Sequence, residues 1–431
     1  MKISLTIKAD NYSQNDLEGF NMYIIDSYYD LPDIDYLHNR IEQLMHEGIA
    51  VKNIANLYNR LKNSENAARK NLQSLYGIDN PNSSQQVLAY FQNIINDDIV
   101  EACCRNGKWT TNKEAMQELA MKGYQEAIDI LTYRKASAYV RAIEQIKEHI
   151  KSDGRLRPKV SYSKTNRINY IDPALMNIPK QLIWHIIAPR TEGNILISVD
   201  IKNQEPWIMI NMLNIKMLKE ILENNREGLY EAVFEKIFGR PCTPIERNEL
   251  KVAWNAMTYG ATFMGVQAIC RHCDGKAIYE FFSKIPEFKQ YRGICYGRAK
   301  KNKQEVETYF GTKVRANEYG PRLQRVLMDI PIQGTGADIL ALLIKHFDEE
   351  METRGLEDVI TLVFTRHDEI IVEVDRNYAN EVGIENVKAI LADVLEHKID
   401  DWEPFNVKIT EVVPPELFID GSVYNPDDDE D

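Results

Sequence analysis

The sequence predicts an α+β fold in which helices predominate, for two reasons. Apolar residues recur at helical spacing through most of residues 15–150 and again across residues 205–300. Only a few short runs have the composition of buried strands, and two of them, TLVFTR and EIIVEV, flank a two-residue turn. With 431 residues, 44% of them hydrophobic, the chain is long enough for two or three domains.

The expected elements follow one another along the chain with clear interruptions. Residues 15–150 are expected to be mainly helical, and SDGRLRP at 152–158 ends this region because Gly and Pro interrupt regular structure. The elements expected downstream are a strand at 194–200, a helix from Glu205 with Pro206 tolerated in its first turn, further helices over 214–300, a strand at 309–314, a loop entering a long helix over 331–355, and a hairpin with His367 and Asp368 at its turn.

The composition favours an intracellular protein that does not cross a membrane. No run of about 18 apolar residues is present, and the N-terminus, MKISLTIKADNYSQ, lacks the apolar core of a signal peptide. Six cysteines are too few at this length for a disulfide framework. The sequence also has no GxxxxGK[ST] phosphate-binding loop, which argues against an ATP-driven motor.

The net charge of −13 argues at first against binding to nucleic acid, but the charge is unevenly distributed. The last five residues, DDDED, are expected to form a solvated acidic tail. Two segments are instead basic: GRLRPKVSYSKTNR at 154–167 and RAKKNK at 298–303. Each is equally consistent with a solubilising loop and with a segment that contacts phosphates.

Two carboxylates lie at the ends of predicted strands. Asp200 follows NILISV, and Asp368 lies at the hairpin turn, so only the fold can bring them together. Carboxylates at adjoining strand ends suit Mg²⁺, which prefers oxygen ligands. Two such ions held close together can activate an attacking oxygen and neutralise a leaving phosphate. The alternative is structural: Asp200 caps the following helix, and Asp368 is a turn residue.

A third segment, RNELKVAWNAMTYG at 247–260, has polar side chains at four-residue intervals. On a helix, such a row drifts only about 40° per step, so its members share one face. The row consists of Arg247, Lys251, Asn255 and Tyr259. Two cations, an amide and a phenol on one stripe could bind a triphosphate and stack on a base. An ordinary exposed helix face is the alternative.

The order and spacing of these segments resemble the family A DNA polymerases, the group of bacterial DNA polymerase I and several phage replicases. The matching segments are RINYIDPALMNIP (167–179), DIKNQE with Asp200 and Glu205, the Arg247-x3-Lys251-x7-Tyr259-Gly260 row, VETYFG (306–311), PIQGTGADI (331–339) and His367-Asp368-Glu369. They span residues 152–376, whereas the first 150 residues match only in helical character and position.

The resemblance implies a right-hand polymerase fold with a palm that contains an antiparallel sheet, fingers and a thumb. The implied regions are an N-terminal segment (1–16), a helical thumb (17–166), a first palm segment (167–212), fingers (213–319), a second palm segment (320–426) and the acidic tail (427–431). Too few residues precede the thumb for a 3′–5′ exonuclease or 5′ nuclease domain. Such a compact polymerase suggests a phage or mobile-element replicase, or a gap-filling or bypass enzyme, in the cytoplasm (nucleoid or infected host cell).

The resemblance also implies roles in catalysis and metal binding. Asp200 and Asp368, helped by the backbone carbonyl of Ile201 and by Glu369, would hold two Mg²⁺ ions, with Mn²⁺ as an expected substitute. Arg247 and Lys251 would contact the triphosphate of a dNTP, and Lys251 would protonate the leaving pyrophosphate. The reaction would be attack of the primer 3′ oxygen on the α-phosphate.

The remaining implied roles concern the nucleotide and the DNA. Tyr259 would lie near the nascent base pair, and Glu205 would exclude the sugar 2′-OH and so select deoxynucleotides. The other residues expected at the dNTP are Asn255 and Tyr230, and those expected at the primer–template are Arg167, Gln333, His367, Asn177 and Arg325. Arg167 and Gln333 would read minor-groove acceptors that every correct base pair presents.

Several positions depart from the family pattern. Asn255 stands where the family usually has an aromatic residue on the sugar, which bears on sugar handling and dideoxynucleotide acceptance. Tyr230 replaces a frequent His, and Asp329 replaces a frequent Asn. DIKNQE also has Ile-Lys-Asn where the family usually has Tyr-Ser-Gln. The departures allow an altered nucleotide preference without indicating its direction.

Two other functions fit some of the pattern. A single-subunit RNA polymerase shares much of the architecture but is disfavoured by Glu205, and a non-catalytic DNA-binding replication scaffold is disfavoured by the retained Asp and Arg/Lys residues. Separate exonuclease, helicase or primase proteins are the expected partners besides DNA and dNTPs. The Cys270-Arg-His-Cys273 segment lacks a second pair at zinc-finger spacing, so we expect reduced cysteines rather than a zinc site.

Overall fold

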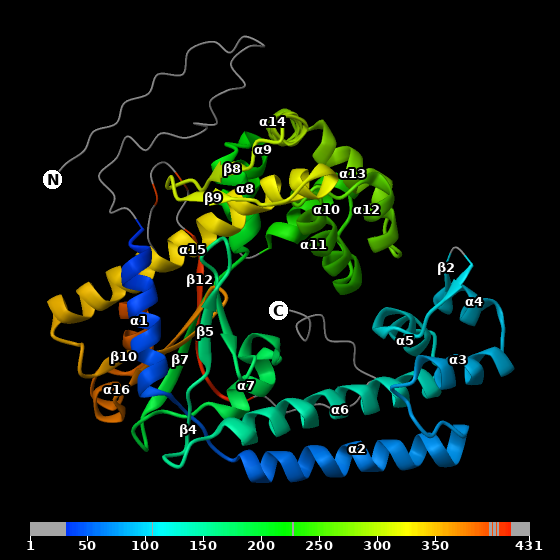
Figure 1. Ribbon diagram of the computed structural model, residues 1–431, viewed down its shortest axis with the longest axis horizontal. Helices are drawn as coiled ribbons and strands as arrows, with labels where there is room; N and C mark the ends of the chain where they lie inside the picture. The colour runs from blue at the N-terminus through cyan, green and yellow to red at the C-terminus, as the bar shows by residue number, and fades with distance from the viewer. Residues whose placement is uncertain are drawn as a thin grey trace. The chain divides into compact units, whose positions relative to one another are not determined.

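The computed structural model describes residues 32–105, 107–225, 228–395, 399, 402 and 405–414. The predicted N-terminal segment 1–16 and acidic tail 427–431 lie outside these described residues. The chain divides into two compact units (Figure 1). Of the described residues, those in the ranges 32–46, 160–169 and 191–411 form one unit, which we call the sheet unit; those in the ranges 47–159, 170–190 and 412–414 form the other, which we call the helical unit.

The helical unit is built around two long helices, α2 (Ile54–Tyr76) and α6 (Gln125–His149), which lie side by side (Figure 1). Its other elements are α3 (Ser84–Asn93), α4 (Asp97–Cys103), α5 (Lys113–Met121), α7 (Lys180–Ile186), the 3-10 helix η1 (Leu175–Asn177), and the strand pairs β1 (Ile49–Ala50) with β4 (Arg155–Leu156) and β2 (Cys104–Arg105) with β3 (Lys108–Trp109). Apolar side chains at helical spacing, such as Leu72, Phe91 and Ile130, are fully buried. They confirm the predicted helices in this range.

The sheet unit contains the remaining elements. Its helices are α1 (Ile34–Glu47), α8 (Gln204–Met212), α9 (Lys216–Asn224), α10 (Leu229–Phe238), α11 (Pro244–Thr258), α12 (Phe263–Ile269), α13 (Gly275–Lys284), α14 (Pro286–Lys300), α15 (Gly320–Arg354), α16 (Arg376–Val382) and α17 (Ile384–Leu395). Its strands are β7 (Ile195–Ile201), β8 (Glu305–Glu307), β9 (Lys313–Arg315), β10 (Ile360–Arg366), β11 (Glu369–Val374) and β12 (Val407–Glu411); the ribbon of β5 (Lys159–Tyr162) and β6 (Ile168–Ile171) crosses the unit boundary.

Four antiparallel strands in the order β10-β11-β7-β12 form the main sheet. Nearly every residue of β7 and all of β11 are buried, as their continuous apolar runs predict. The predicted hairpin is confirmed: β10 and β11 are joined by His367 and Asp368, with His367 at φ 52°. Such a positive φ is uncommon outside glycine and marks a tight turn.

Three sequence expectations were wrong in detail. The strand expected at 309–314 is mostly the turn between β8 and β9, with Gly311 at φ +85°, and only Lys313 and Val314 of that range belong to a strand, β9. The helix expected from Glu205 is two helices, because Asn214 adopts φ 51° and ends α8. The loop expected from Pro331 belongs to the continuous helix α15, which carries Pro331 inside it.

Close packing explains the two glycines of α15 that suggested a loop. A Cβ added at Gly334 would meet the Thr308 methyl at 2.6 Å, and one at Gly336 would meet Gln204 Oε1 at 2.8 Å. The glycines therefore let α15 approach the β8–β9 turn and α8, at a cost of about 1 kcal/mol each in helix propensity. α15 is long and apolar enough to span a membrane, but 83% of its apolar window is buried, which is typical of a core helix.

A buried acid links α15 to the β8–β9 turn. Asp338 is fully buried, and its two carboxyl oxygens accept hydrogen bonds from the hydroxyls of Thr308 and Thr312. The Thr335 hydroxyl accepts a 2.9 Å hydrogen bond from the Tyr309 backbone N–H. Burial raises the pKa of Asp338 to about 7, although the two threonine donors act in the opposite direction.

We predict that Asp338→Asn makes the stability of the protein less sensitive to pH. Because the folded-state pKa is raised, the contribution of Asp338 to stability is complete below pH ~4 and is lost as pH rises towards 7, by on the order of 4 kcal/mol. The asparagine lacks this ionisation, so its melting temperature should exceed that of the wild type at pH 8, and this difference should shrink as the pH falls towards ~4. Thermal melts of both proteins, with the exposed-acid variant Asp358→Asn as control, measure this; parallel pH profiles for wild type and Asp338→Asn would contradict it.

Candidate active site

The register of the sheet brings the sequence-distant carboxylates to one end of two neighbouring strands. Asp200 on β7 lies opposite Glu369 on β11, and Asp368 directly precedes Glu369. On the other side of β7, Lys408 of β12 lies opposite Asp200. Paired residues of antiparallel strands point to the same face of the sheet. Asp200 and Glu369 therefore share a face, although no short-range pattern in the sequence connects them.

The three carboxylates differ in their surroundings. Asp200 and Asp368 are half-buried, whereas Glu369 is 2% exposed and accepts a hydrogen bond from the Ser198 hydroxyl. The described residues contain no group of three or more His, Cys, Asp or Glu side chains arranged to hold a metal ion alone. The predicted donors, two half-buried carboxylates and the Ile201 carbonyl, are all oxygens and suit Mg²⁺ only if bound molecules complete the coordination.

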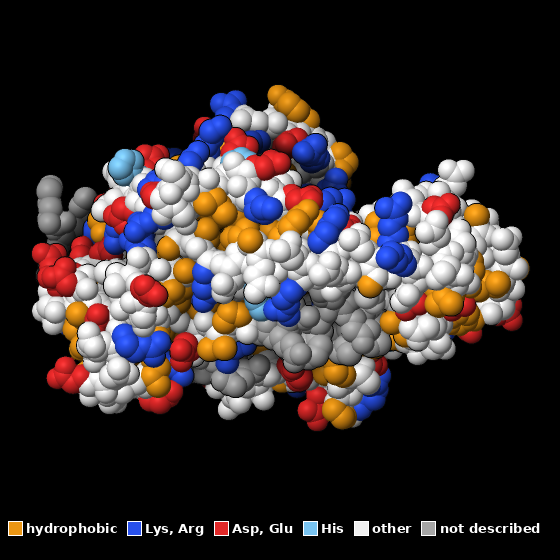
Figure 2. All heavy atoms as spheres, turned by 90° about the horizontal axis from the view of Figure 1, so that it is seen from below, with side chains coloured by type: hydrophobic (Ala, Val, Ile, Leu, Met, Phe, Trp, Pro, Cys, Tyr) orange, Lys and Arg blue, Asp and Glu red, His pale blue; other side chains and the backbone are white. Residues whose placement is uncertain are grey.

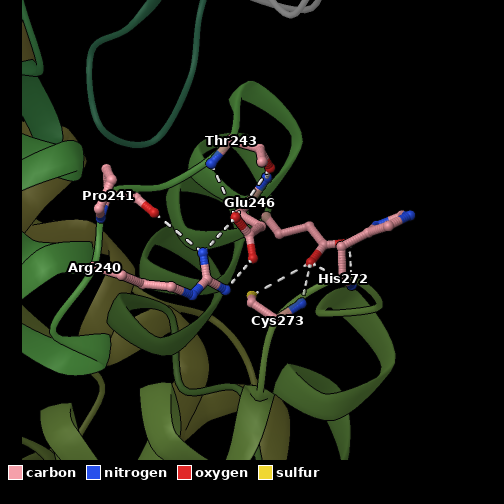
Figure 3. A network of polar contacts seen from close by, with 7 residues as sticks. Arg240, Pro241, Thr243, Glu246, His272 and Cys273 are labelled. Atoms are coloured by element: carbon pink, nitrogen blue, oxygen red, sulfur yellow. Dashed lines mark hydrogen bonds and ion pairs between the residues drawn. The ribbon is translucent and has the colours of Figure 1, made fainter.

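The helix with the predicted triphosphate row, α11, begins at a strongly stabilised N-terminus (Figure 3). Thr243 and Glu246 form a capping box, in which each side chain accepts a hydrogen bond from the other residue's backbone N–H. Arg240 donates to both oxygens of Glu246, at 2.5 and 3.0 Å. The hydrogen bonds from Arg240, and to a smaller extent those from Thr243, lower the pKa of Glu246 to about 2. The carboxylate thus stays charged at the positive end of the helix.

Arg247, Lys251 and Asn255 lie in α11 and share one face of the helix, as predicted. Arg247 forms an ion pair with Glu231. Its Nε donates to Glu231 Oε1 of α10 at 2.6 Å, and its guanidinium lies 5.4 Å from the Tyr230 ring centroid. Tyr230 is 2% exposed and packs edge-to-face on Trp254. The Tyr230 ring therefore packs against the Arg247 guanidinium. Direct contact between Tyr230 and a nucleotide stays a prediction.

The Cys270–Cys273 segment is organised by an acid from α11. Glu249 accepts hydrogen bonds from the backbone N–H groups of Arg271, His272 and Cys273, and from the Cys273 thiol at 3.3 Å. His272 Nδ1 also lies 2.7 Å from Glu249 Oε1 (Figure 3 shows the His272 and Cys273 side of this network). Both cysteines are thiols. The neighbouring Cys270, burial and Glu249 raise the pKa of Cys273, and the reduced, zinc-free pair stays a prediction.

Two residues predicted for different tasks form an ion pair. Arg167 Nη2 lies 2.8 Å from Glu205 Oε1, with side chains 34% and 22% exposed. Tyr259, the C-cap of α11, lies beside this pair. Burial is the main cause that raises the pKa of Tyr259 far above its ordinary value, and the Glu205 carboxylate is the second. Asp329 of α15 is the fourth member: burial raises its pKa to about 6, Glu205 adds to this, and Arg167 opposes it. We call these four residues the Arg167 cluster.

Helix α15 presents a second polar row. Arg325, Asp329 and Gln333 follow one another at four-residue intervals, so they lie along one side of the helix. Gly260, at φ +84°, lies against this helix: an added Cβ would meet Met328 Sδ at 3.2 Å and Arg325 Cγ at 3.4 Å. A side chain at Gly260 would therefore push the end of α11 away from α15, which explains a glycine after Tyr259.

The remaining predicted DNA contacts are exposed or locally paired. His367 is exposed at the hairpin turn, and Asn177 is exposed at η1 in the helical unit. In the basic segment 154–167, Arg157 pairs with Asp153 at 2.6 Å and Lys159 with Asp172 at 2.8 Å. Basic and acidic side chains are interspersed on the face shown in Figure 2. Phosphate contacts by the basic segments thus stay predictions.

Some residues that shape the site were absent from the sequence-based prediction. Glu246 had a signal, because Thr-Pro-x-Glu is a capping-box pattern with proline at the first helical position. Ser198 lies two residues before Asp200 on the same strand face. Glu231 had no signal, since its pairing with Arg247 joins two helices through tertiary packing.

Comparison with known proteins gives a consistent result. The profile of DNA polymerase family A matches residues 51–410. DNA polymerase I of Rhizobium leguminosarum is 23% identical over 316 residues, covering 68% of this chain and 30% of that protein; DNA polymerase I of Aquifex aeolicus is 23% identical over 349 residues, covering 76% and 58%. The chain thus spans less than two thirds of the length of each of these two relatives. The structure described as the "POL domain of Pol1 from M. smegmatis complex with DNA primer-template and dNTP" is similar in fold, with a TM-score of 0.70, 21% identity, and coverage of 87% of this chain and 69% of that one.

We predict that Glu246→Ala destabilises the protein by about 2 kcal/mol, because it removes the capping box and the Arg240 ion pair together. The matched control is Glu280→Ala on α13, whose partners Lys276 and Lys284 form exposed ion pairs worth less than about 0.5 kcal/mol. Denaturant unfolding compares the two variants. Equal losses of stability would show that the α11 N-terminus does not depend on this cap.

Proposed function

This chain belongs to DNA polymerase family A, and on that premise we propose that it is a template-directed DNA polymerase that extends a primer 3′ end with dNTPs. The observation that carries the proposal is the register of β7 on β11, which gathers Asp200, Asp368 and Glu369 at one end of the sheet. These residues come from two motifs that the family resemblance picks out independently. Carboxylates gathered in this way are what metal-assisted phosphoryl transfer requires.

We propose that Asp200, Asp368 and the Ile201 carbonyl hold divalent ions, with Glu369 as an adjacent ligand. Two Mg²⁺ ions bound there would supply charge neutralisation at the reacting phosphate and activation of the primer 3′ oxygen. The protein's own role is positioning. The Ser198 hydroxyl orients Glu369, and the paired strands fix the spacing between the two aspartates.

The exposed side of α11 is the proposed binding surface for the triphosphate. Arg247 and Lys251 are one helical turn apart and half-buried, so their charges can act on phosphates. Tyr230 supports Arg247 from below. Lys251 would donate the proton to the leaving pyrophosphate, and Asn255, one turn further on, would contact the sugar.

The Arg167 cluster is the proposed site of sugar selection and primer-terminus recognition. Glu205 lies in the first turn of α8, shortly after the end of β7 that carries Asp200, and its pairing with Arg167 holds it in place. In that position its side chain would occupy the space of a ribose 2′-OH. Tyr259 would lie near the nascent base pair, and Arg325, Gln333, His367 and Asn177 would contact the DNA.

The rival functions make different predictions for the same assay. A single-subunit RNA polymerase would extend primers with rNTPs at least as efficiently as with dNTPs. A non-catalytic scaffold would bind DNA without extending it. The expectation that no 3′–5′ exonuclease accompanies the polymerase is tested by a primer with a mismatched 3′ end, which should be extended slowly but not excised.

We predict that Asp200→Asn and Asp368→Asn each reduce primer extension by on the order of 10³-fold, because each removes a metal-binding charge. The melting temperature should fall little, since both side chains are half-buried and the amides preserve their shape. Primer extension with Mg²⁺ and a defined template measures the effect, with Asp358→Asn as an exposed control. Full activity in both active-site variants would refute the proposed function.

We predict that Glu205→Ala relaxes sugar selection and raises rNTP incorporation relative to dNTP incorporation by about 10²-fold, since one steric contact is removed. The matched control is Glu231→Ala, which removes another acid beside the proposed nucleotide surface but lies away from the sugar. The measurement is the ratio of kcat/KM for dCTP and rCTP. An unchanged ratio in Glu205→Ala would remove this residue from sugar selection.

A further inference from the structure

The Arg167 cluster contains more acid than its single cation can neutralise. Glu205 already accepts the 2.8 Å contact from Arg167 Nη2. Asp329 faces the same pair from α15, and its Oδ1 is buried without a hydrogen bond among the residues that the structure describes. A buried carboxylate oxygen without a donor is costly when ionised. The structure therefore leaves Asp329 competing with Glu205 for the same guanidinium.

The charge of the cluster depends on Asp329. With this residue ionised, the two acids outweigh Arg167 and the cluster carries one net negative charge; with it protonated, the cluster is neutral. Burial raises the pKa of Asp329 to about 6, with Arg167 opposing the rise and Glu205 adding to it, so the change occurs slightly below neutral pH.

The other titratable groups near Asp329 keep their charge. Tyr259 stays neutral, because burial and Glu205 raise its pKa. On α14, Tyr291 donates to the Met328 carbonyl, and burial raises the pKa of Cys295 to about 12. Arg325, one turn before Asp329 on α15, is exposed.

We propose that Asp329 is a positioning residue that couples primer–template binding to the uptake of one proton. This inference rests on the proposed function, in which Arg167 turns towards the minor groove at the primer terminus. DNA brings a high density of negative charge, and its groove edges offer acceptors to Arg167. An ionised Asp329 repels the duplex and holds Arg167 back. A proton from solvent on the Asp329 carboxylate removes both effects, so Arg167 can contact the bases.

The test is the pH dependence of primer–template affinity without dNTP. Fluorescence anisotropy between pH 5.5 and 8 should show wild-type affinity falling by up to about tenfold per pH unit above 6, relative to Asp329→Asn and Asp329→Ala. The matched control is Asp338→Asn, which removes another buried acid of α15 away from the cluster and should follow the wild type. Calorimetry in buffers of different ionisation enthalpy should show the wild type taking up to about one proton more than Asp329→Asn.

The outcomes separate this inference from the proposed function. If the wild type extends primers but Asp329→Asn and Asp329→Ala keep its pH profile and proton uptake, the inference is wrong and the polymerase assignment stands. If the wild type neither binds nor extends primer–template, both fail together. Thermal melts at each pH identify a variant that loses affinity because it unfolds. If either Asp329→Asn or Asp329→Ala unfolds, the pH profile of the other variant tests the inference.

Discussion

The pairing of β7 with β11 is the constraint on which the rest of the sheet unit depends. Side chains alternate between the two faces of a strand, so a slip of one residue would turn Asp200 away from Glu369. Burial prevents such a slip, because nearly all side chains of both strands lie inside the protein. The same apolar runs that hold the core therefore also fix the relative positions of the carboxylates.

Charge around the site is balanced locally rather than across the whole chain. The net charge is −13, yet Glu205, Glu246 and Glu231 are each paired with a particular arginine, whereas Asp329 is the acid of the Arg167 cluster that the ion pair leaves over. Glu246 closes the start of α11, Glu249 holds the loop after α12, and Glu231 accepts from Arg247. Overall composition thus gives little guidance to the chemistry of such a surface.

The sequence alone predicted most elements whose signal is local. The helices of 54–149, the strand ending at Asp200 and the hairpin around His367 all follow from periodicity and turn residues. The error at Pro331 arose where proline and the following glycines suggested a break, whereas tertiary packing of α15 on Thr308 and Gln204 explains the glycines. The error at 309–314 was the opposite, because a strand was expected where the chain turns at Gly311. The Arg167–Glu205 and Arg247–Glu231 pairs depend on contacts between separate segments, which no pattern in one chain discloses.

The Arg247–Glu231 pair has a consequence for ligand choice. The Arg247 guanidinium already donates to the Glu231 carboxylate at 2.6 Å, so an anionic ligand can bind it only by displacing that carboxylate. To do so, the ligand must carry more negative charge than the single carboxylate it replaces. A triphosphate meets that condition, whereas a monophosphate or a stray carboxylate meets it poorly. In the protein without ligand, Glu231 thus competes with anions for Arg247. The surface of α11 therefore favours highly charged anions over singly charged ones.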